Sequence, residues 1–451
     1  MPSVVHKLLN FDLPNPRFCF HRYYKMPTPI QVKTWTSGNQ TYVLHSIVLN
    51  PSTVTDKENT VISCLLNPLL ISLLPDLSIA QKSVQNISYC VLPTPLKGFG
   101  MFATRDIPAG ELIAIEHPAL ILPAASLPEE AYNEIGLQLP DRRRAELMSM
   151  ANSRTSEECP SPVEGIVRTN ALALQLNFPK SMANDGTDAK LYGGVYPLLN
   201  RCNHRYRVFF FDLDFLAIHI LTSRPYTSSC GPNAAIKWDL ATLSASLYAL
   251  RPIRSGEEIL KTYIDPVLPR ATRVATLLKN YRFLCDCPWC DVHHHHYQPE
   301  SSDNNDAVTT PSNEKPAFSP AELAQIAASD NNRALLVKWI FTHPGYLKWS
   351  TDLCRPDDLV INAHLEALAL IDKEGLQGLQ NLFTEEIAMC YAILGEEVEF
   401  RRWGQKVVQL SRVEDPPLAA RFEEWLENPP KKFKRWAWRK KQRMRKFFFF
   451  F

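Results

Sequence analysis

The sequence predicts an α+β protein in which a β-rich first part is followed by an α-helical C-terminal domain. Short apolar runs separated by glycine and proline, in residues 91–114 and again in residues 234–265, are typical of short strands joined by turns. Between them, residues 127–152 and 163–177 have the apolar spacing of helices. We therefore expect a β-rich core that is interrupted by a helical insert at about residues 120–190.

Length and composition bound the class of protein. The chain has 451 residues, of which 45% are hydrophobic, so two or three domains with sizeable cores are expected and disorder of the whole chain is excluded. The longest apolar stretch, residues 61–74, is shorter than the ~18–20 residues that span a bilayer. The first residues also lack the pattern of a secretory signal. We expect an intracellular protein, nuclear or cytoplasmic, with no membrane span and with eleven reduced cysteines.

Charge is distributed unevenly along the chain. Residues 431–446 contain ten Lys or Arg and no acid, so the net charge of +2 leaves +2 − 10 = −8 for the rest. A body of this charge lacks the positive face of a dedicated nucleic-acid binder, and it favours a cationic substrate by electrostatic steering. The basic tail, residues 431–451, is compatible with a contact to nucleic acid, to anionic lipid or to an acidic partner.

Three segments outside the predicted core differ in character. Residues 1–90 have no strong periodicity, so their structure stays uncertain between strands and loops. Residues 293–317 have the composition of a linker. Directly after the linker, Ser319 can cap a helix, a proline fits the first turn, and Glu322 closes a capping box. A helix is therefore expected to begin at residue 320 and to open a helical C-terminal domain of residues 318–430.

A cysteine run is the strongest local signal of chemistry. It reads Cys285-Asp286-Cys287-Pro288-Trp289-Cys290. Three thiolates this close suit one tetrahedral Zn²⁺, which needs a fourth ligand from elsewhere in the chain. Cys230, Cys202 and His293 are the candidates for that ligand, and three unpaired buried thiols are the alternative to a metal site.

Several motifs in residues 91–292 together resemble the SET-domain family of lysine methyltransferases. The resemblance is greater to the split branch, in which a helical insert interrupts the core and a cysteine-rich post-SET segment and a helical region follow. The matching segments are the opening glycine motif Gly98-Phe99-Gly100, the Thr-Asn segment of residues 168–171, the tyrosine-bearing segment of residues 256–263, and the aromatic lead into the cysteine run, residues 281–285.

The family's central motif, Asn-His-Ser-Cys-x-Pro-Asn, is split in this chain. Asn203-His204 is followed by Arg205, and the remainder appears only at Ser229-Cys230-Gly231-Pro232-Asn233. Deletion of residues 205–228 would restore the motif, and the 24 residues correspond to 72 nucleotides, which preserves the reading frame. Codons for Arg205 and Tyr206, and for Ser229, can supply the two splice junctions. We predict a retained intron at residues 205–228, with a genuine loop insertion as the alternative.

The resemblance implies a protein-lysine N-methyltransferase that uses S-adenosyl-L-methionine and acts on a histone or another protein. The alternative is a catalytically inactive SET-like module that binds other proteins, which the split motif favours for the chain as written. Catalysis would fall to Tyr263, and the fourth ligand of a structural zinc would be Cys230, beside Cys285, Cys287 and Cys290. The expected cofactor-binding residues are Lys97, Gly98, Phe99, Gly100, Asn203, His204, Asn233, Tyr263 and Phe283.

Overall fold

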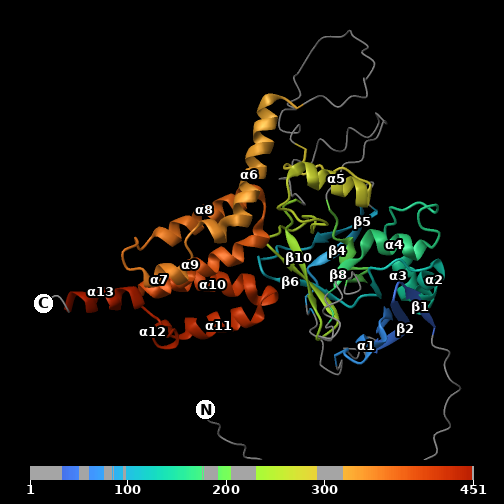
Figure 1. Ribbon diagram of the computed structural model, residues 1–451, viewed down its shortest axis with the longest axis horizontal. Helices are drawn as coiled ribbons and strands as arrows, with labels where there is room; N and C mark the ends of the chain where they lie inside the picture. Colours follow the sequence, from blue (N-terminus) through green and yellow to red (C-terminus); the bar gives the residue numbers. More distant parts are fainter. Residues whose placement is uncertain are drawn as a thin grey trace, which may run out of the picture. The chain divides into compact units, whose positions relative to one another are not determined.

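The structure is a computed structural model and confirms the predicted α+β class (Figure 1). It describes residues 33–49, 60–75, 84, 86–94, 98–174, 176, 191–204, 230–291 and 318–448. Strands dominate the described part up to residue 249, and helices dominate from residue 318 onward. Residues from Thr34 to Phe451 belong to one compact unit. The predicted intron, residues 205–228, lies outside the described residues, so the retained intron stays a prediction.

A six-stranded sheet joins the start of the described chain to the later core. Its order is β1 (Thr34–Ser37), β2 (Gln40–Leu49), β3 (Thr60–Leu66), β7 (Leu120–Pro123), β9 (Tyr192–Val195) and β8 (Leu172–Leu174). All neighbours are antiparallel except β3 and β7. Although residues 1–90 lack a clear period, three of their strands therefore extend the central sheet.

Two smaller sheets complete the β-rich part. One contains β10 (Ala234–Asp239), β11 (Ser244–Ala249) and β6 (Leu112–Glu116), and the other pairs β4 (Tyr89–Thr94) with β5 (Gly98–Ala103). A short helix, α1 (Pro68–Ile71), follows β3. The strand expected at residues 259–263 is absent from the described strands. Single bridges, Phe102 to Glu258 and Asn203 to Leu260, hold this segment instead.

Helices lie where the sequence places the insert. They are α2 (Glu129–Leu137), α3 (Asp141–Met148) and α4 (Pro162–Asn170), and α5 (Arg270–Tyr281) precedes the cysteine run. Ser161 caps α4 by accepting a hydrogen bond from the backbone N–H of Glu164. The helical spacing expected to continue to residue 177 is wrong beyond Asn170, because residues 172–174 pair with β9 as strand β8.

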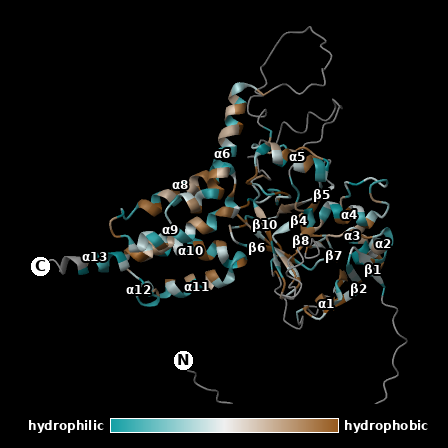
Figure 2. Ribbon diagram, in the orientation of Figure 1, coloured by the Kyte–Doolittle hydropathy of each residue, from teal (hydrophilic) through white to brown (hydrophobic). Residues whose placement is uncertain are grey.

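The C-terminal region is built of helices that pack on their neighbours (Figures 1 and 2). They are α6 (Pro320–Thr342), α7 (Tyr346–Thr351), α8 (Leu359–Glu374), the 3₁₀ turn η7 (Gln377–Leu379), α9 (Gln380–Leu394), α10 (Glu397–Glu414), α11 (Pro416–Glu427), α12 (Pro429–Lys432) and α13 (Trp438–Phe448). The expected capping box is confirmed, because Ser319 and Glu322 bond to each other's backbone N–H groups. None of the described helices combines the length and apolar character that a membrane span requires.

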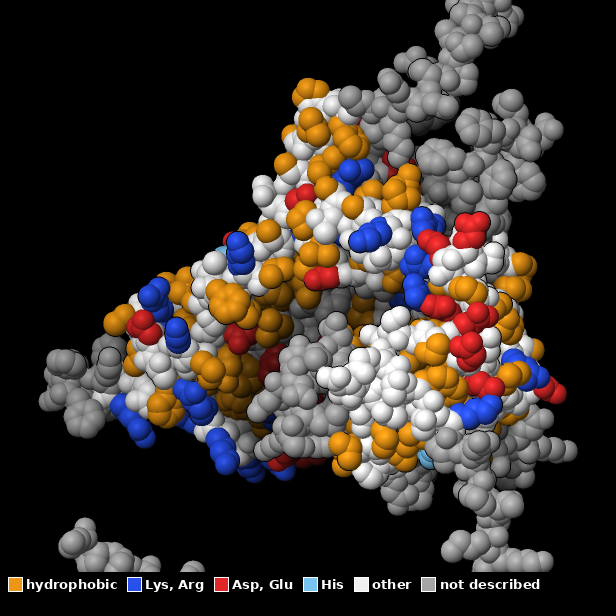
Figure 3. Space-filling view, turned by 45° about the vertical axis from the view of Figure 1, so that its right-hand side comes forward, with side chains coloured by type: hydrophobic (Ala, Val, Ile, Leu, Met, Phe, Trp, Pro, Cys, Tyr) orange, Lys and Arg blue, Asp and Glu red, His pale blue; other side chains and the backbone are white. Residues whose placement is uncertain are grey.

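Helix α6 packs on one side only. Leu336 and Trp339 are buried in the core of the helical region, whereas Val337 and Ile340 are more than half exposed and Phe341 is 83% exposed. Figure 3 shows apolar side chains at the surface along this helix. The outer face of α6 therefore exposes several large apolar side chains that the core does not cover.

Part of the predicted basic tail packs into the helical core. Phe433 and Trp436 are buried there, and the guanidinium of Arg439 is fully buried against the ring of Trp349. Its Nε atom donates to the carboxylate of Asp357 at 2.9 Å. These residues stabilise the helical region, and Arg443 also pairs with Asp357, so part of the basic charge of the segment is engaged within the chain.

Candidate active site and metal centre

The main candidate site is a cavity of about 580 Å³, called here the aromatic pocket. It is bordered by β5, by the helical insert, by the 3₁₀ turn η3 (Leu199–Arg201) and by the segments around residues 263 and 283. The volume lies within the ~300–1,000 Å³ typical of small-molecule sites. Five residues expected to bind the cofactor line it: Gly98, Phe99, Asn203, Tyr263 and Phe283.

Tyr263 lies in a cluster of rings at the edge of the aromatic pocket. Its ring centre lies 4.9 Å from that of Tyr281 and 6.3 Å from that of Phe283. The hydroxyl of Tyr281 donates to the carbonyl oxygen of Tyr263 at 3.3 Å. Both the ring and the backbone of Tyr263 are therefore held by neighbouring aromatic side chains.

Two asparagines of the split motif hold the segment that leads to Tyr263. The amide of Asn203 donates to the carbonyl oxygen of Phe99 and to the carboxylate of Glu258, both at 3.1 Å. The amide of Asn233 donates to the carboxylate of Glu257, and its oxygen accepts from the N–H of Leu260 at 2.7 Å. Both asparagines are buried, so these hydrogen bonds replace the strand pairing that the segment lacks.

Four of the expected cofactor residues are not among the described residues that line the aromatic pocket. Lys97 lies outside the described residues. Gly100 lies under the carboxylate of Glu258, where an added Cβ would come within 3.0 Å of an oxygen. Asn233 is buried among the backbone groups of the segment before Tyr263. The structure therefore gives Gly100 and Asn233 a supporting position behind the pocket wall.

His204, the fourth of them, connects the aromatic cluster with the cysteine cluster. Its Nδ1 atom accepts from the backbone N–H of Tyr263 at 3.3 Å, which leaves the ring proton on Nε2. Nε2 lies 3.8 Å from the sulfur of Cys230. A single buried ring thus couples the position of Tyr263 to the position of a candidate metal ligand.

Two further cavities continue from the aromatic pocket. A narrow cavity of about 150 Å³ shares Asn200, Tyr263 and Tyr281 with it. An apolar pocket of about 390 Å³ shares Leu172 and Lys261 with the narrow cavity. The three cavities therefore adjoin in the order aromatic pocket, narrow cavity, apolar pocket, with Tyr263 at the first junction.

Sequence analysis missed several residues of these cavities. Residues 149–153, from the turn after α3, line the aromatic pocket because the insert folds back onto the core. Asn200 and Lys261 line the narrow cavity. A lysine in the otherwise apolar run of residues 259–264 was the available signal for Lys261, because a charge in a buried segment is uncommon.

The four predicted zinc ligands come together in one cluster. The sulfur atoms of Cys230, Cys285, Cys287 and Cys290 all lie within 4.8 Å of one another, and all four side chains are buried. Cys230 is 3.8 Å from Cys285 and 3.5 Å from Cys290, measured between sulfurs. Of the other candidates for the fourth ligand, Cys202 lies against Met101 instead, and His293 lies outside the described residues.

The spacing and chemistry of this cluster fit a zinc ion. Four sulfurs at ~2.3 Å from one tetrahedral Zn²⁺ lie ~3.8 Å apart, close to the separations found here. Burial raises the pKa of the Cys287 thiol well above its usual value, so a buried thiolate there needs a compensating cation. These four residues could therefore hold the metal.

Two buried arginines join the cysteine cluster to its surroundings. Arg273 of α5 donates to the backbone carbonyls of Leu268 and Trp289. Arg333 of α6 donates to the carbonyls of Cys230 and Glu374, and its Nε lies 3.2 Å from the Glu374 carboxylate. The helical region is thus bonded directly to the segment that carries a predicted ligand.

Trp289 occupies a tight space at the same junction. Its indole N–H donates to the carbonyl oxygen of Lys373 at 3.2 Å. An added Cβ on Gly231 would lie 2.7 Å from the indole, and one on Gly375 would lie 2.3 Å from it. The absence of side chains at both glycines therefore lets the indole fit between the two segments.

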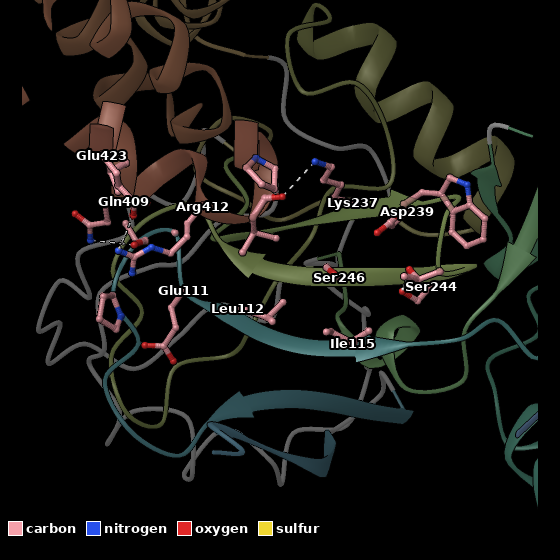
Figure 4. A pocket seen from close by; sticks show the side chains of 18 of the residues that line it. Glu111, Leu112, Ile115, Lys237, Asp239, Ser244, Ser246, Gln409, Arg412 and Glu423 are labelled. Carbon is pink, nitrogen blue, oxygen red and sulfur yellow. Dashed lines mark hydrogen bonds and ion pairs between the residues drawn. The ribbon is translucent and has the colours of Figure 1, made fainter. Parts of the chain in front are cut away.

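A further cavity, of about 1000 Å³, lies elsewhere, between α10 and the sheet of β6, β10 and β11 (Figure 4). Lys237 donates there to the carbonyls at the end of α10, and Arg412 lies 3.7 Å from Glu423. None of the residues expected to carry chemistry lines this cavity. The candidate site is therefore the group of three adjoining cavities.

Comparison with known proteins identifies the class. Residues 98–264 match the model of the SET domain. The chain is 26% identical over 204 residues to histone-lysine N-methyltransferase set5 of Schizosaccharomyces pombe, covering 45% of this chain and 50% of the relative. It is 41% identical over 63 residues to SET domain and MYND-type zinc finger protein 6 of the same yeast, covering 14% of this chain and 13% of the relative. The chain thus spans half or less of these relatives.

Among solved structures, the Neurospora SET domain protein DIM-5, a histone lysine methyltransferase, aligns at 14% identity and a TM-score of 0.22. The alignment covers 44% of this chain and 66% of that chain. The sequence match, the β-rich core and the adjoining cysteine cluster define a SET-domain protein. Residues 98–264 therefore correspond to a SET domain, and the cluster of four cysteines is consistent with a post-SET zinc motif.

Proposed function

We propose that the chain is an S-adenosyl-L-methionine-dependent methyltransferase that acts on the lysine ε-amine of a protein. The observation that carries the proposal is the series of three adjoining cavities with Tyr263 at the first junction. A cofactor and a protein side chain can approach such a junction from opposite sides, which is the arrangement that an in-line transfer requires.

The aromatic pocket is the proposed cofactor site. Phe99 and Phe283 offer rings to a heteroaromatic base, and Asn200 and Asn203 offer polar groups, which together suit an adenosine-type ligand. Bound S-adenosyl-L-methionine supplies an electrophilic methyl group on a sulfonium. Arg201 stacks over Phe99 at 5.2 Å and fixes that ring at the pocket wall.

The narrow cavity is the proposed channel for the substrate lysine. Ala171, Leu172 and Ala173 form part of its lining, so an entering ammonium group loses water and is driven toward its neutral, nucleophilic form. Tyr263 borders both this cavity and the aromatic pocket, and its hydroxyl is proposed to orient the amine toward the methyl group. The proton lost by the amine leaves to solvent.

Methyl transfer from radiolabelled cofactor to a panel of cell proteins tests the proposal. The full chain and a chain without residues 205–228 are compared, because the deletion restores the uninterrupted central motif. We expect the shortened chain to bind the cofactor and to transfer methyl groups to protein. The full chain should bind the cofactor weakly. Equal cofactor affinity of the two forms would show that the insertion is a harmless loop.

The second candidate is a catalytically inactive SET-like module that binds proteins. The split between His204 and Ser229 favours it for the chain as written, since it interrupts the motif that holds Tyr263. A shortened chain that binds the cofactor but labels no protein would move the assignment to this candidate. Fold alone does not separate the two, because related folds can serve catalysis or binding.

Two finer points belong to the same proposal. The cysteine cluster is proposed to bind a structural Zn²⁺ that holds Phe283 beside the aromatic pocket. A relative with the name histone-lysine N-methyltransferase favours a histone as substrate, and hence a nuclear site of action. Mass spectrometry of labelled histones and of other labelled proteins distinguishes a histone substrate from a non-histone one.

A further inference from the structure

Lys261 has a position that the proposed reaction does not explain. It lies two residues before Tyr263, is only 5% exposed, and lines both the narrow cavity and the apolar pocket. Its Nζ atom donates to Oδ1 of Asn200 at 2.6 Å and lies 5.5 Å from the ring centre of Tyr263. A lysine amine is therefore already present where the substrate amine is proposed to pass.

The amine of Lys261 has a hydrogen-bond acceptor but no counter-ion at ion-pair distance in the described part of the chain. Glu116 and the Cys202 thiol are the titratable groups that act on it most, and the Glu116 carboxylate is engaged by Arg143 at 3.2 Å and by backbone N–H groups. The Asn200 oxygen accepts from the amine, and an ammonium is the stronger donor.

Burial affects when Lys261 is charged. Loss of water lowers the pKa of this lysine to about 8, while Cys202 and Glu116 act in the opposite direction. Lys261 therefore carries a positive charge at pH 7 and loses it as the pH rises past 8. Near neutral pH, the channel contains one fixed ammonium group.

We propose that the ammonium of Lys261 acts on the incoming substrate lysine through like-charge repulsion, so that the substrate amine gives up its proton and becomes the nucleophile. The inference rests on the proposed function, because it requires a substrate lysine in the narrow cavity. Two ammonium groups in one desolvated cavity repel strongly, and one of them loses a proton at a lower pH than it would alone. The Asn200 oxygen accepts from Lys261, and the Glu116 carboxylate also favours the charged form of Lys261, so in this proposal the substrate amine is the group that is deprotonated. Pairing of a reactive lysine with a second cation is a recognised way to activate it.

The pH dependence of turnover tests this inference. In Lys261→Met the substrate amine no longer meets a second cation, so the pH of half-maximal kcat should rise by about one to two units. Turnover at pH 7 should fall roughly tenfold or more and recover at high pH. Lys338→Met, at an exposed position of α6, is the matched control and should leave the profile unchanged.

Two further variants separate charge from structure. Lys261→Gln keeps a hydrogen-bond donor for Asn200 but carries no charge, so it should behave like Lys261→Met. Lys261→Arg keeps the positive charge at every pH. Its kcat should therefore rise with pH over the same range as that of the wild type on the acidic side of the profile. Affinity for S-adenosylhomocysteine, measured by calorimetry, shows whether each variant keeps a folded pocket.

The measurements distinguish a failure of this inference from a failure of the proposed function. If Lys261→Gln shows the wild-type pH dependence of kcat, or if every folded variant does, Lys261 has a structural role only and the inference is wrong. If Lys261→Met does not fold, the contrast between the Gln and Arg variants decides the question. If neither form of the wild-type chain transfers methyl groups, the proposed function itself fails, and this inference fails with it.

Discussion

The SET region and the helical region of this chain are stabilised in different ways. In the SET region, segments far apart in sequence meet through single buried side chains, such as Asn203, Asn233 and His204. In the helical region, α8, α9, α10 and α11 each pack on the next helix along the chain and share one apolar core. A change in the first region should therefore act at a distance, whereas a change in the second should stay local.

The largest effect is expected at the cysteine cluster. Cys287→Ser should lower the zinc content from about one per chain, and the loss of metal should reduce the free energy of unfolding by roughly 5 kcal/mol or more, because binding energy at a structural zinc is folding energy. Metal analysis and thermal unfolding measure both quantities. Cys390→Ser, at a buried cysteine of the helical region, should leave the zinc content unchanged. A wild-type protein that is folded and free of metal would contradict the zinc assignment.

A smaller loss is expected where the two regions are bonded together. Arg333→Met removes the only cation beside the buried Glu374 carboxylate that the described contacts show, although Ser329 and Asn332 still donate to it. The carbonyls of Cys230 and Glu374 also lose a donor. Breaking a buried ion pair from one side costs about 3–5 kcal/mol. Urea unfolding measures it, with the exposed Arg402→Met as control. A cost near that of the control would show that the regions are held together by other contacts.

Catalysis should respond to a change that leaves stability almost intact. Tyr263→Phe in the chain without residues 205–228 removes one hydroxyl at the junction of two cavities. Turnover should fall roughly 100-fold while cofactor affinity changes little, because that hydroxyl is used mainly in the transition state. Single-turnover labelling and calorimetry give the two values. Unchanged turnover would exclude Tyr263 from the reaction.

The smallest effect is expected at the capping box that begins α6. Ser319→Ala removes the acceptor of the capping box at the start of α6 and should cost about 1 kcal/mol of stability. Ser319→Asp keeps an acceptor and should cost less. Thermal unfolding compares the three proteins. A loss several times larger would mean that this end of α6 also acts at a distance, which would weaken the contrast between the regions.

The same contrast explains what could be predicted from sequence. The start of α6 is encoded within four residues, Ser319 to Glu322, so a local pattern predicts it correctly. Three of the four clustered cysteines also lie within six residues. The fourth, Cys230, required the resemblance to a family motif, because no local pattern relates it to the other three.

Features that depend on distant partners could not be predicted. Residues 259–263 have the composition of a strand, but the N–H of Leu260 bonds to the side chain of Asn233 and that of Lys261 to the backbone of Asn203. These contacts replace a neighbouring strand. The burial of Lys261 likewise depends on Asn200, which lies 61 positions earlier in the chain. No periodicity within a short window contains that information.

The fit of Trp289 between Gly231 and Gly375 also has an evolutionary consequence. A side chain at either glycine would collide with the indole, so neither glycine can change while the tryptophan is present. A smaller residue at position 289 would release both positions together. Among relatives that share this junction, the three positions should therefore vary as a group, and their covariation would record the contact between the SET and helical regions over the history of the family.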